Sequence, residues 1–245
     1  MKRKFVVVGL ALAFVVACES DDPVEEQVTD MPEASEEQPV EEPQEEEPEG
    51  PPLRETDRPS DDEIGQLPDG VGLAVGEELP DVAATDADGE EVRLVDLVED
   101  QTIALFFYRG GWCPFCNFQI RDMTQAFDDF AERGVLPVAV SVDQPSEAAK
   151  TQGAYEIPFP VLSDPDLEVH EAFQVTYQAE EEEVQKLAEM GMDLEASSGR
   201  DHNSYAIPGV FIIDSNATVR WAHANMDYSV RPSPKQLLEA IDGLE

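Results

Sequence analysis

The sequence is poor in cationic side chains. It contains 15 Lys and Arg residues against 55 Asp and Glu residues, which gives a formal net charge of −40. Binding to nucleic-acid phosphates requires a basic surface, so this deficit excludes nucleic acid as an expected partner. Direct adhesion to anionic lipid is disfavoured for the same reason, and any link to a membrane would have to be covalent or hydrophobic.

The amino-terminal region lacks an apolar run long enough to cross a bilayer. Residues 5–16 form an apolar stretch, whereas a spanning helix needs about 20 residues. A basic stretch at residues 2–4 precedes it, and Ala17 and Cys18 follow, which is typical of a secretion signal. Residues 15–18 (VVAC) resemble the lipobox of bacterial lipoproteins. The resemblance implies an acylated Cys18, an exported lipoprotein of the cell envelope and a membrane link through this lipid anchor only. An uncleaved transmembrane helix or an ordinary signal peptide is the alternative.

Aromatic residues are absent from residues 18–70, which also hold nine of the 19 prolines. Such a segment cannot bury enough apolar surface to offset the entropy of ordering its backbone. We therefore predict a lipoprotein signal peptide at residues 1–17, a disordered, acidic, self-repelling linker at 18–70, and one folded domain at 71–245.

The pattern after residue 70 predicts an α/β domain. Residues 102–108 (TIALFFY) and 135–142 are continuous apolar runs, as in strands buried on both faces, and the period between them becomes helical from Pro114 to Gly134. Strands alternating with helices indicate a central sheet flanked by helices, and a hairpin around Asp88 makes that sheet mixed. Further strand-like stretches lie at 73–79, 82–97, 159–162, 209–214 and 218–222, and further helices at 146–155, 167–173, 180–191 and 235–241. Residues 176–205 form an insertion.

Cysteine is scarce: the chain has three, and the lipid anchor would use one. The other two, Cys113 and Cys116, are too close in sequence to staple a fold usefully, which favours a redox-active pair. Cys113 follows a Gly-Gly turn at the start of the predicted helix, where free N–H groups and the helix dipole stabilise a thiolate. Pro114 suits the first helical turn, and Arg109 is a candidate for stabilising the thiolate.

Two other interpretations of the pair remain open. Inert structural thiols are one. Half of a metal site is the other, and its remaining ligands would have to come from three histidines that show no paired spacing, His170, His202 and His223.

Residues 108–116 (YRGGWCPFC) resemble the peroxiredoxin-like branch of the alkyl hydroperoxide reductase/thiol-specific antioxidant (AhpC/TSA) family, which has the thioredoxin fold. Stretches at 162–166, 211–214 and 227–231 support the resemblance. It implies that Cys113 attacks a hydroperoxide and becomes a sulfenic acid, and that Cys116 condenses with it to a disulfide. A thioredoxin-like donor would reduce this disulfide, and no cofactor or metal is implied. Trp112 would shape the rim of the site, although a packing role suits it equally.

Two positions depart from the family pattern. Gly110 replaces the Thr that ordinary peroxiredoxins place three residues before the attacking Cys. Pro208 replaces the Arg that precedes the strand at 209–214. Thioredoxins have a cis-proline at this second place, so the bond between Ile207 and Pro208 is predicted to be cis. Three cations could replace the missing Arg: Arg109, Arg220 and Arg231.

These departures leave alternative functions open. The runner-up is a thioredoxin-type thiol-disulfide oxidoreductase that acts on disulfides of exported proteins. The third is a copper-carrying thioredoxin-fold module, although such modules have a wider cysteine spacing than this chain.

Overall fold

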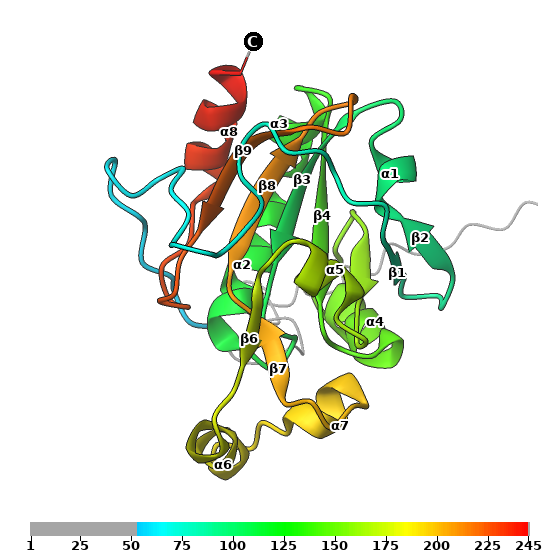
Figure 1. Cartoon of the computed structure of the whole chain (residues 1–245), viewed down its shortest axis with the longest axis vertical. Coiled ribbons are helices and arrows are strands. Elements are labelled where there is room, and N and C mark those ends of the chain that lie inside the picture. Colours follow the sequence, from blue (N-terminus) through cyan, green and yellow to red (C-terminus); the bar gives the residue numbers. More distant parts are fainter. Residues whose placement is uncertain (1–52, 245) are drawn as a thin grey trace, which may run out of the picture. The chain divides into compact units, whose positions relative to one another are not determined.

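A computed structural model describes residues 53–244 of the chain. Its centre is a seven-stranded sheet in the order β2-β1-β5-β4-β3-β8-β9, and a separate two-stranded sheet pairs β6 with β7 (Figure 1). The strands are β1 (Ala83–Thr85), β2 (Glu91–Arg93), β3 (Thr102–Phe107), β4 (Val135–Ser141), β5 (Val161–Ser163), β6 (Thr176–Gln178), β7 (Ser204–Ala206), β8 (Gly209–Ile213) and β9 (Val219–Ala224). The helices are α1 (Leu94–Leu97), α2 (Pro114–Gln125), α3 (Phe127–Ala131), α4 (Pro145–Ala154), α5 (Glu168–Ala172), α6 (Glu181–Glu189), α7 (Leu194–Ser198) and α8 (Pro234–Asp242).

The seven-stranded sheet is mixed, as predicted. β3, β4 and β5 are parallel neighbours, and β8, β9, β1 and β2 join them in antiparallel pairs. The hairpin predicted around Asp88 connects β1 to β2. Because β3 and β4 are parallel, the turns that follow them lie at the same edge of the sheet. The segment after β3 is the one that carries Cys113.

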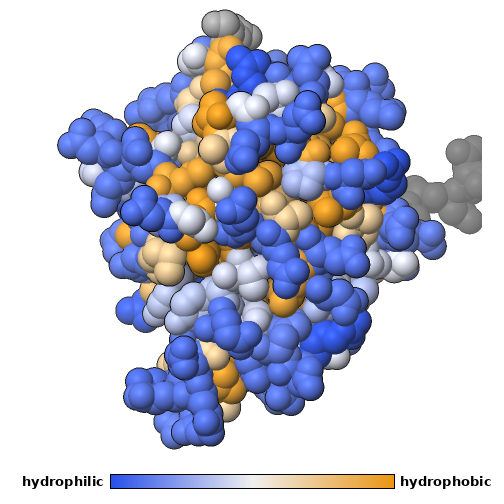
Figure 2. Space-filling view, viewed as in Figure 1, coloured by the Kyte–Doolittle hydropathy of each residue, from blue (hydrophilic) through white to orange (hydrophobic). Residues whose placement is uncertain are grey.

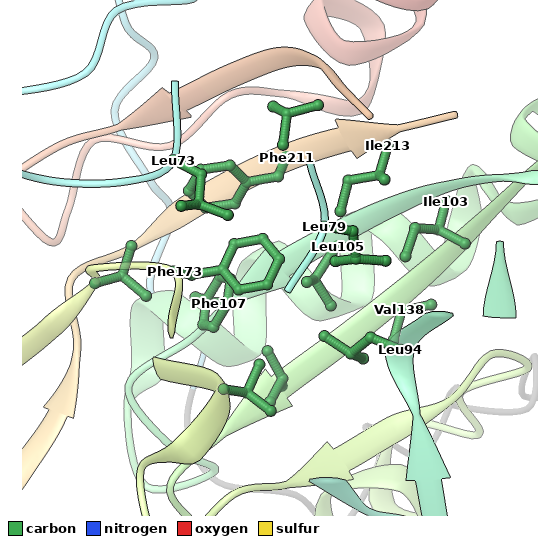
Figure 3. Close-up of a cluster of buried hydrophobic side chains, with 14 of the residues drawn as sticks. Leu73, Leu79, Leu94, Ile103, Leu105, Phe107, Val138, Phe173, Phe211 and Ile213 are labelled. Carbon is green, nitrogen blue, oxygen red and sulfur yellow. The ribbon is translucent and has the colours of Figure 1, made fainter. Parts of the chain in front are cut away.

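Strand alternation divides the buried side chains between the two faces of the sheet. One face carries the first core, which includes Ile103, Leu105 and Phe107 of β3 (Figure 3). The other face carries the second core, which includes Phe106 and Tyr108 and both cysteines. The continuous apolar run at 102–108 is therefore explained, since both faces of β3 are covered. The buried members of the first core that Figure 3 labels are Leu73, Leu79, Leu94, Ile103, Leu105, Phe107, Val138, Phe173, Phe211 and Ile213.

Three stretches differ from the sequence prediction. Residues 94–97, expected within a strand-like stretch, form α1. The helix expected to run to Gly134 is divided at Ala126, whose ψ of 7° is not helical. The ring of Phe127, just after this break, packs against Phe159 with 6.2 Å between the ring centroids. Residues 73–79 form no strand beyond an isolated bridge from Glu78 to Thr218. Gly76 lies within this stretch at a φ of +94°, a left-handed conformation that interrupts an extended chain.

The predicted linker ends earlier than expected, because residues 53–70 pack on the domain. The backbone N–H of Arg54 donates to the Pro114 carbonyl at 3.2 Å, and Asp57 pairs with Val230. The side chain of Gln236 in α8 donates to the Pro59 carbonyl at 3.0 Å. The folded domain therefore includes residues 53–70, which were predicted to belong to the linker. The signal at 1–17, Cys18 and the linker up to residue 52 lie outside the described residues.

The insertion forms a small unit of its own, with β6, α6, α7 and β7 in sequence order. Figure 1 shows α6 and α7 beyond the β6–β7 pair, and Figure 2 shows mainly hydrophilic side chains over this end of the molecule. A small buried cluster packs Leu187, Leu194 and Tyr205 of the insertion against Val142 and Leu167 of the sheet domain. Among residues 53–244, none of the helices has the length and apolarity needed to cross a membrane.

Candidate active site

Cys113 and Cys116 lie at the start of α2, as predicted. Cys113 is the N-cap residue, Pro114 occupies the first helical turn, and the Cys113 carbonyl accepts the Asn117 N–H at 3.0 Å. Both cysteines are reduced and buried, with 1% and 0% of their surfaces exposed. The Cys113 side chain receives no capping hydrogen bond from the helix N–H groups. The helix end therefore contributes its dipole, but no direct N–H donor, to this sulfur.

The Gly-Gly turn before the cysteines has room for glycine only. A Cβ on Gly110, whose φ is +149°, would lie 2.3 Å from Nε1 of Trp112, and a Cβ on Gly111 would lie 2.1 Å from Oγ1 of Thr151. The turn is fixed on both sides: the Gly111 N–H donates to Asp143 Oδ2 at 2.7 Å, and its carbonyl accepts from Asn117 Nδ2 at 2.8 Å. This packing explains why position 110 cannot hold the family's Thr in this conformation.

Arg231 is the cation that reaches the cysteine pair. Its side chain is buried at 1% exposure, and Nη2 donates to the Cys116 sulfur at 3.3 Å. Nη1 donates to Gln119 Oε1 at 2.6 Å, and Nε donates to the Tyr228 carbonyl at 2.9 Å. A buried guanidinium is costly unless its N–H groups are satisfied, and here all three nitrogens donate. Of the three candidate replacements for the family's Arg, Arg231 is the one whose side chain donates to a cysteine sulfur.

Arg109 is also close, but it acts differently. Its backbone N–H donates to the Cys116 sulfur at 3.4 Å. Its buried guanidinium lies over three aromatic rings, 4.9 Å from Trp112 and 4.3 Å from both Tyr205 and Tyr228. Glu183 of α6 approaches Nη2 at 3.8 Å. Arg109 thus adds positive charge near the pair, while aromatic faces hold its side chain in place.

The N–H donors around the pair meet the Cys116 sulfur and not the Cys113 sulfur. Burial alone would raise the pKa of Cys116, but the Cys113 thiol, Arg231 and Arg109 lower this pKa to about 5. Burial, together with Cys116, raises the pKa of Cys113 well above its usual value, and the two arginines only partly oppose this. The physical reason is that the protein's N–H donors converge on the second sulfur. The two sulfurs share one proton and one negative charge at neutral pH.

Cys113 is nevertheless the accessible member of the pair. It lines a cavity of about 280 Å³ between the start of α2 and the insertion, together with Arg109 and Trp112. Leu187 and Met190 line the same cavity from the side of the insertion. Of the two cysteines, Cys113 is the one that lines this cavity, and Trp112 contributes to the wall beside it.

Pro208 is not among the residues that line the cavity beside Cys113. It lines a neighbouring cavity of about 300 Å³, which it shares with Arg109 and Tyr205. The peptide bond between Ile207 and Pro208 is trans, so the prediction of a cis bond is wrong. On either side of this bond, the Ile207 N–H donates to the Val175 carbonyl at 2.7 Å, and the Pro208 carbonyl accepts the Asn225 N–H at 3.1 Å. These bonds hold the trans chain between β7 and β8.

The remaining sequence candidates lie outside the site. Arg220 pairs with Asp214 at 2.9 Å, beyond the end of β8 remote from the cysteines. His170 is buried against Asp164 with 2.6 Å between Nδ1 and Oδ2, and His202 contacts the Pro165 carbonyl. Within residues 53–244, no three His, Cys, Asp or Glu side chains form a group that could hold a metal ion. The copper-carrier alternative therefore has no ligand set in this part of the chain.

Several side chains of the site carry no clear sequence signal. From the sequence, Arg231 is one of three equal candidates, and Asn117 and Gln119 are ordinary helix residues. Asp143 follows a strand and has no motif of its own. The best available signal is the position of Arg231 at the end of the stretch 227–231, which resembles the family although it lies far from the cysteines in sequence.

The residues that hold the cysteine pair and the parallel strands match a protein-family model. The model of the AhpC/TSA family matches residues 75–222. The chain belongs to the AhpC/TSA family. This match includes both cysteines, Asp143 and Pro208, whereas Arg231 lies beyond the matched residues. The side chain that donates to Cys116 in this AhpC/TSA protein, Arg231, therefore comes from outside the matched family region.

Curated relatives of this AhpC/TSA chain include two bacterial proteins. A putative peroxiredoxin of Mycobacterium tuberculosis is 35% identical over 97 residues, which are 40% of this chain and 61% of the relative. Peroxiredoxin Bcp of Escherichia coli is 30% identical over 103 residues, which are 42% of this chain and 65% of the relative. The chain thus spans less than two thirds of the length of these relatives.

Solved structures support the fold of the AhpC/TSA domain. Peroxidoxin BcpB of Mycobacterium tuberculosis superposes with a TM-score of 0.55 at 21% identity and covers 71% of this chain and 99% of its own. At this level of identity the likeness concerns the fold alone. The predicted thioredoxin-like fold, with a central mixed sheet flanked by helices, is confirmed.

Proposed function

We propose that this protein is a thiol-dependent peroxidase that reduces hydroperoxides through Cys113 and Cys116. The observation that carries the proposal is the buried guanidinium of Arg231, which donates to the Cys116 sulfur at 3.3 Å although Pro208 occupies the family's Arg position. A cation beside the pair keeps one negative charge on the two sulfurs at neutral pH, and only a thiolate attacks a peroxide. Membership of the AhpC/TSA family supports the same chemistry.

The reaction begins with proton transfer from the Cys113 thiol to the Cys116 sulfur, which leaves a thiolate facing the cavity. The Cys113 sulfur attacks one peroxide oxygen, the O–O bond breaks, and the departing alkoxide takes up a proton to become an alcohol. Cys113 is then a sulfenic acid. After Cys116 loses its proton again, its sulfur attacks the Cys113 sulfur, the S–O bond breaks and water leaves. One thiol, one thiolate, one hydroperoxide and one proton from the solvent thus become a disulfide, an alcohol and water.

The disulfide must be reduced before a second turnover. We propose a thioredoxin-like protein as the donor, because its thiolate can attack one sulfur of the Cys113–Cys116 bond by thiol–disulfide exchange. Cys113 is the sulfur that lines a cavity, so we expect the mixed disulfide to form there. This donor contributes two electrons for each hydroperoxide reduced.

A peroxide assay on reduced protein tests the function. We expect one equivalent of hydrogen peroxide to be consumed per cysteine pair, Cys113→Ser to be inactive, and Cys116→Ser to accumulate a sulfenic acid on Cys113 that a dimedone-type reagent traps. A peroxide reaction no faster than that of free cysteine, together with reduction of a disulfide substrate such as insulin, would replace this proposal with a thioredoxin-type disulfide oxidoreductase.

We also propose that the protein is an exported bacterial lipoprotein of the cell envelope, held to a membrane by an acylated Cys18. The lipobox-like VVAC at residues 15–18, after a basic and an apolar stretch, supports this. Several acyl chains on one residue give stable anchoring, whereas a single chain is marginal. Mass spectrometry of the full chain expressed in a bacterium should find lipid on Cys18, and Cys18→Ser should release the protein from the membrane fraction. An unmodified Cys18 would contradict the anchor.

A further inference from the structure

The buried carboxylate of Asp143 is not used by the proposed peroxidase reaction. Asp143 lies just after β4, next to the segment that leaves β3, and 1% of its surface is exposed. Its Oδ2 accepts the Gly111 N–H at 2.7 Å and the Ser141 hydroxyl at 3.1 Å. Its Oδ1 has no hydrogen-bond partner among residues 53–244. A buried oxygen without a partner is costly, so a role other than packing must be sought for it.

The unpaired oxygen points to the turn that carries the cysteines. A Cβ built on Gly110 would lie 2.8 Å from Asp143 Oδ1 and 2.3 Å from Trp112 Nε1, so both atoms border the same small space. Trp112 Nε1 also has no hydrogen-bond partner within the described residues. The carboxylate thus touches the turn twice, through the bond to Gly111 and through the contact beside Gly110.

A cavity of about 590 Å³ gives this carboxyl group access to protons. Asp143 lines it together with Gly111, Trp112 and Thr151. Its volume exceeds that of several water molecules, each of which occupies about 30 Å³ in the liquid. A proton can therefore reach Asp143 without passing the cavity in front of Cys113.

Charged groups from each neighbouring element face Asp143. Burial raises its pKa to about 7; the bonds from Gly111 and Ser141 oppose this, and the charges of Cys116 in α2 and Glu147 in α4 add to it. Tyr108, at the end of β3, feels the Asp143 charge in turn, and burial together with that charge raises its pKa well above the usual value. Lys150 of α4 is the cation that lines the same cavity.

We propose that Asp143 is a positioning residue, which fixes the Gly110–Gly111 turn beneath the cysteine pair and couples its own proton to the charge on Cys116. The coupling follows from like charges: an anionic Asp143 disfavours an anionic Cys116, and the reverse. The bond to Gly111 is stronger when the carboxyl group is ionised, because a charged acceptor binds an N–H more tightly. The turn is therefore held most firmly above neutral pH. The proposal rests on the thiol chemistry proposed above, but its test requires no peroxide.

The first test uses Trp112 as a reporter of the Asp143 proton. Trp221 is the only other tryptophan in the chain, so a Trp221→Phe background isolates the emission of Trp112. We expect this emission to change with a midpoint near neutral pH, and Asp143→Asn to abolish the change. Asp214→Asn is the matched control, because Asp214 accepts backbone N–H groups of Asn216 and Thr218 in a turn at the opposite end of β8. A transition that survives in Asp143→Asn, or none in its parent, overturns the proposal.

The second test removes the charge of Cys116 and follows the proton of Asp143. Asp143 titrates above Cys116, so in the Trp221→Phe background Cys116→Ser should lower the midpoint of the Trp112 emission change by about half to one pH unit, since a like charge is removed. An unchanged or higher midpoint contradicts the coupling.

The third test separates charge from anchoring. Asn keeps an oxygen for the Gly111 N–H, so alkylation of Cys113 by iodoacetamide should change less than about threefold in Asp143→Asn and rise about tenfold in Asp143→Ala, as the turn loosens. Equal rates in the two variants would show that Asp143 does not anchor the turn. Should Asp143→Ala fail to fold, the Trp112 emission titrations of Asp143→Asn and Cys116→Ser still decide the proposal. A protein that passes these tests but does not reduce peroxide would contradict only the proposed function.

Discussion

The two faces of the central sheet are both covered by apolar side chains, yet they differ at one end. In the first core, the Phe107 ring centroid lies 5.7 Å from that of Phe211, and the Phe173 centroid lies 5.1 Å from each of them. A buried His170–Asp164 pair lies against Phe107. The second core contains the cysteine pair, and Arg231 donates into it from the segment between β9 and α8. The polar pair beside the first core joins a histidine to a carboxyl group, whereas the second core brings a buried cation to a cysteine sulfur.

The difference shows what the second face requires in addition to packing. A buried guanidinium is tolerated only when its N–H groups find acceptors, and a buried thiolate only when donors surround it. Arg231 and Cys116 satisfy each other in part, and Gln119 and the Tyr228 carbonyl complete the set around Arg231. We infer that variants of the first core change stability, and that variants of the second change the titration of the thiols.

The largest expected effect tests the first core. Phe211→Ala removes a fully buried ring that contacts Phe107 and Phe173, and we expect it to lower the free energy of unfolding by about 3–5 kcal/mol. Urea denaturation measures this loss. The pKa of Cys116 should stay near its original value in the folded variant. Val75→Ala is the control, because Val75 is 60% exposed and its loss should change stability by about 0.5 kcal/mol or less. A similarly small loss for Phe211→Ala would contradict the role assigned to the first core.

The next effect tests the second core. Arg231→Met removes the cation and the N–H donor at Cys116, so the pKa of this thiol should rise from about 5 toward its usual value. A rise of two pH units corresponds to about 3 kcal/mol, and the rate of alkylation at mildly acidic pH should fall accordingly. Arg220→Met is the matched control, since Arg220 pairs with Asp214 in an exposed position. An unchanged thiol titration in Arg231→Met would remove the main support for the proposed function.

The contrast between the two faces also explains what could be predicted from sequence. The run at 102–108 and the helix start at Pro114 are local patterns, so β3, α2 and the position of Cys113 at the N-cap follow from them. The contact of Arg231 with Cys116 joins residues 115 positions apart. Its geometry depends on how the segment after β9 crosses the start of α2, and no local pattern encodes that.

The same limit applies to two details of the site. A helix N-terminus indicates an anion at Cys113, but the side chains and the Arg109 N–H that choose between the two sulfurs come from elsewhere in the chain. A proline beside a Cys-x-x-Cys pair suggests a cis bond by analogy, whereas the bonds on either side of Ile207 and Pro208 determine the observed trans chain.

A smaller effect concerns stability against pH at Asp143. The pKa of this carboxyl group is raised from 3.8 to about 7 in the folded protein, so folding favours its protonated form. Its contribution to stability is therefore present at low pH and is lost as the pH rises from about 4 to 7. Asp143→Asn removes this dependence, and its stability relative to the parent should rise by about 2 kcal/mol between mildly acidic and neutral pH, then level off. Urea denaturation across this range, with Asp214→Asn as control, measures it; a constant difference would contradict the raised pKa.

The smallest effect tests how the insertion influences the second core. Glu183 of α6 lies 3.8 Å from Arg109 and accepts hydrogen bonds from the hydroxyls of Tyr177 and Tyr205. Its charge offsets part of the Arg109 charge, so Glu183→Gln should lower the apparent pKa of Cys116 slightly. The side chain of Glu183 is 32% exposed, and an ion pair this accessible contributes less than about 1 kcal/mol, which limits the decrease to less than about one pH unit.

The neighbouring residue gives the control for this last variant. Glu182 pairs with Lys186 at 2.8 Å on the exposed side of α6, so Glu182→Gln removes the same charge one position away without touching Arg109. Thiolate titrations of the two variants at moderate ionic strength separate a contact effect from a general change in net charge. An equal decrease in both would mean that the insertion acts only through the long-range field of a strongly acidic chain. A decrease confined to Glu183→Gln would mean that the insertion sets the charge available to the cysteines through Arg109.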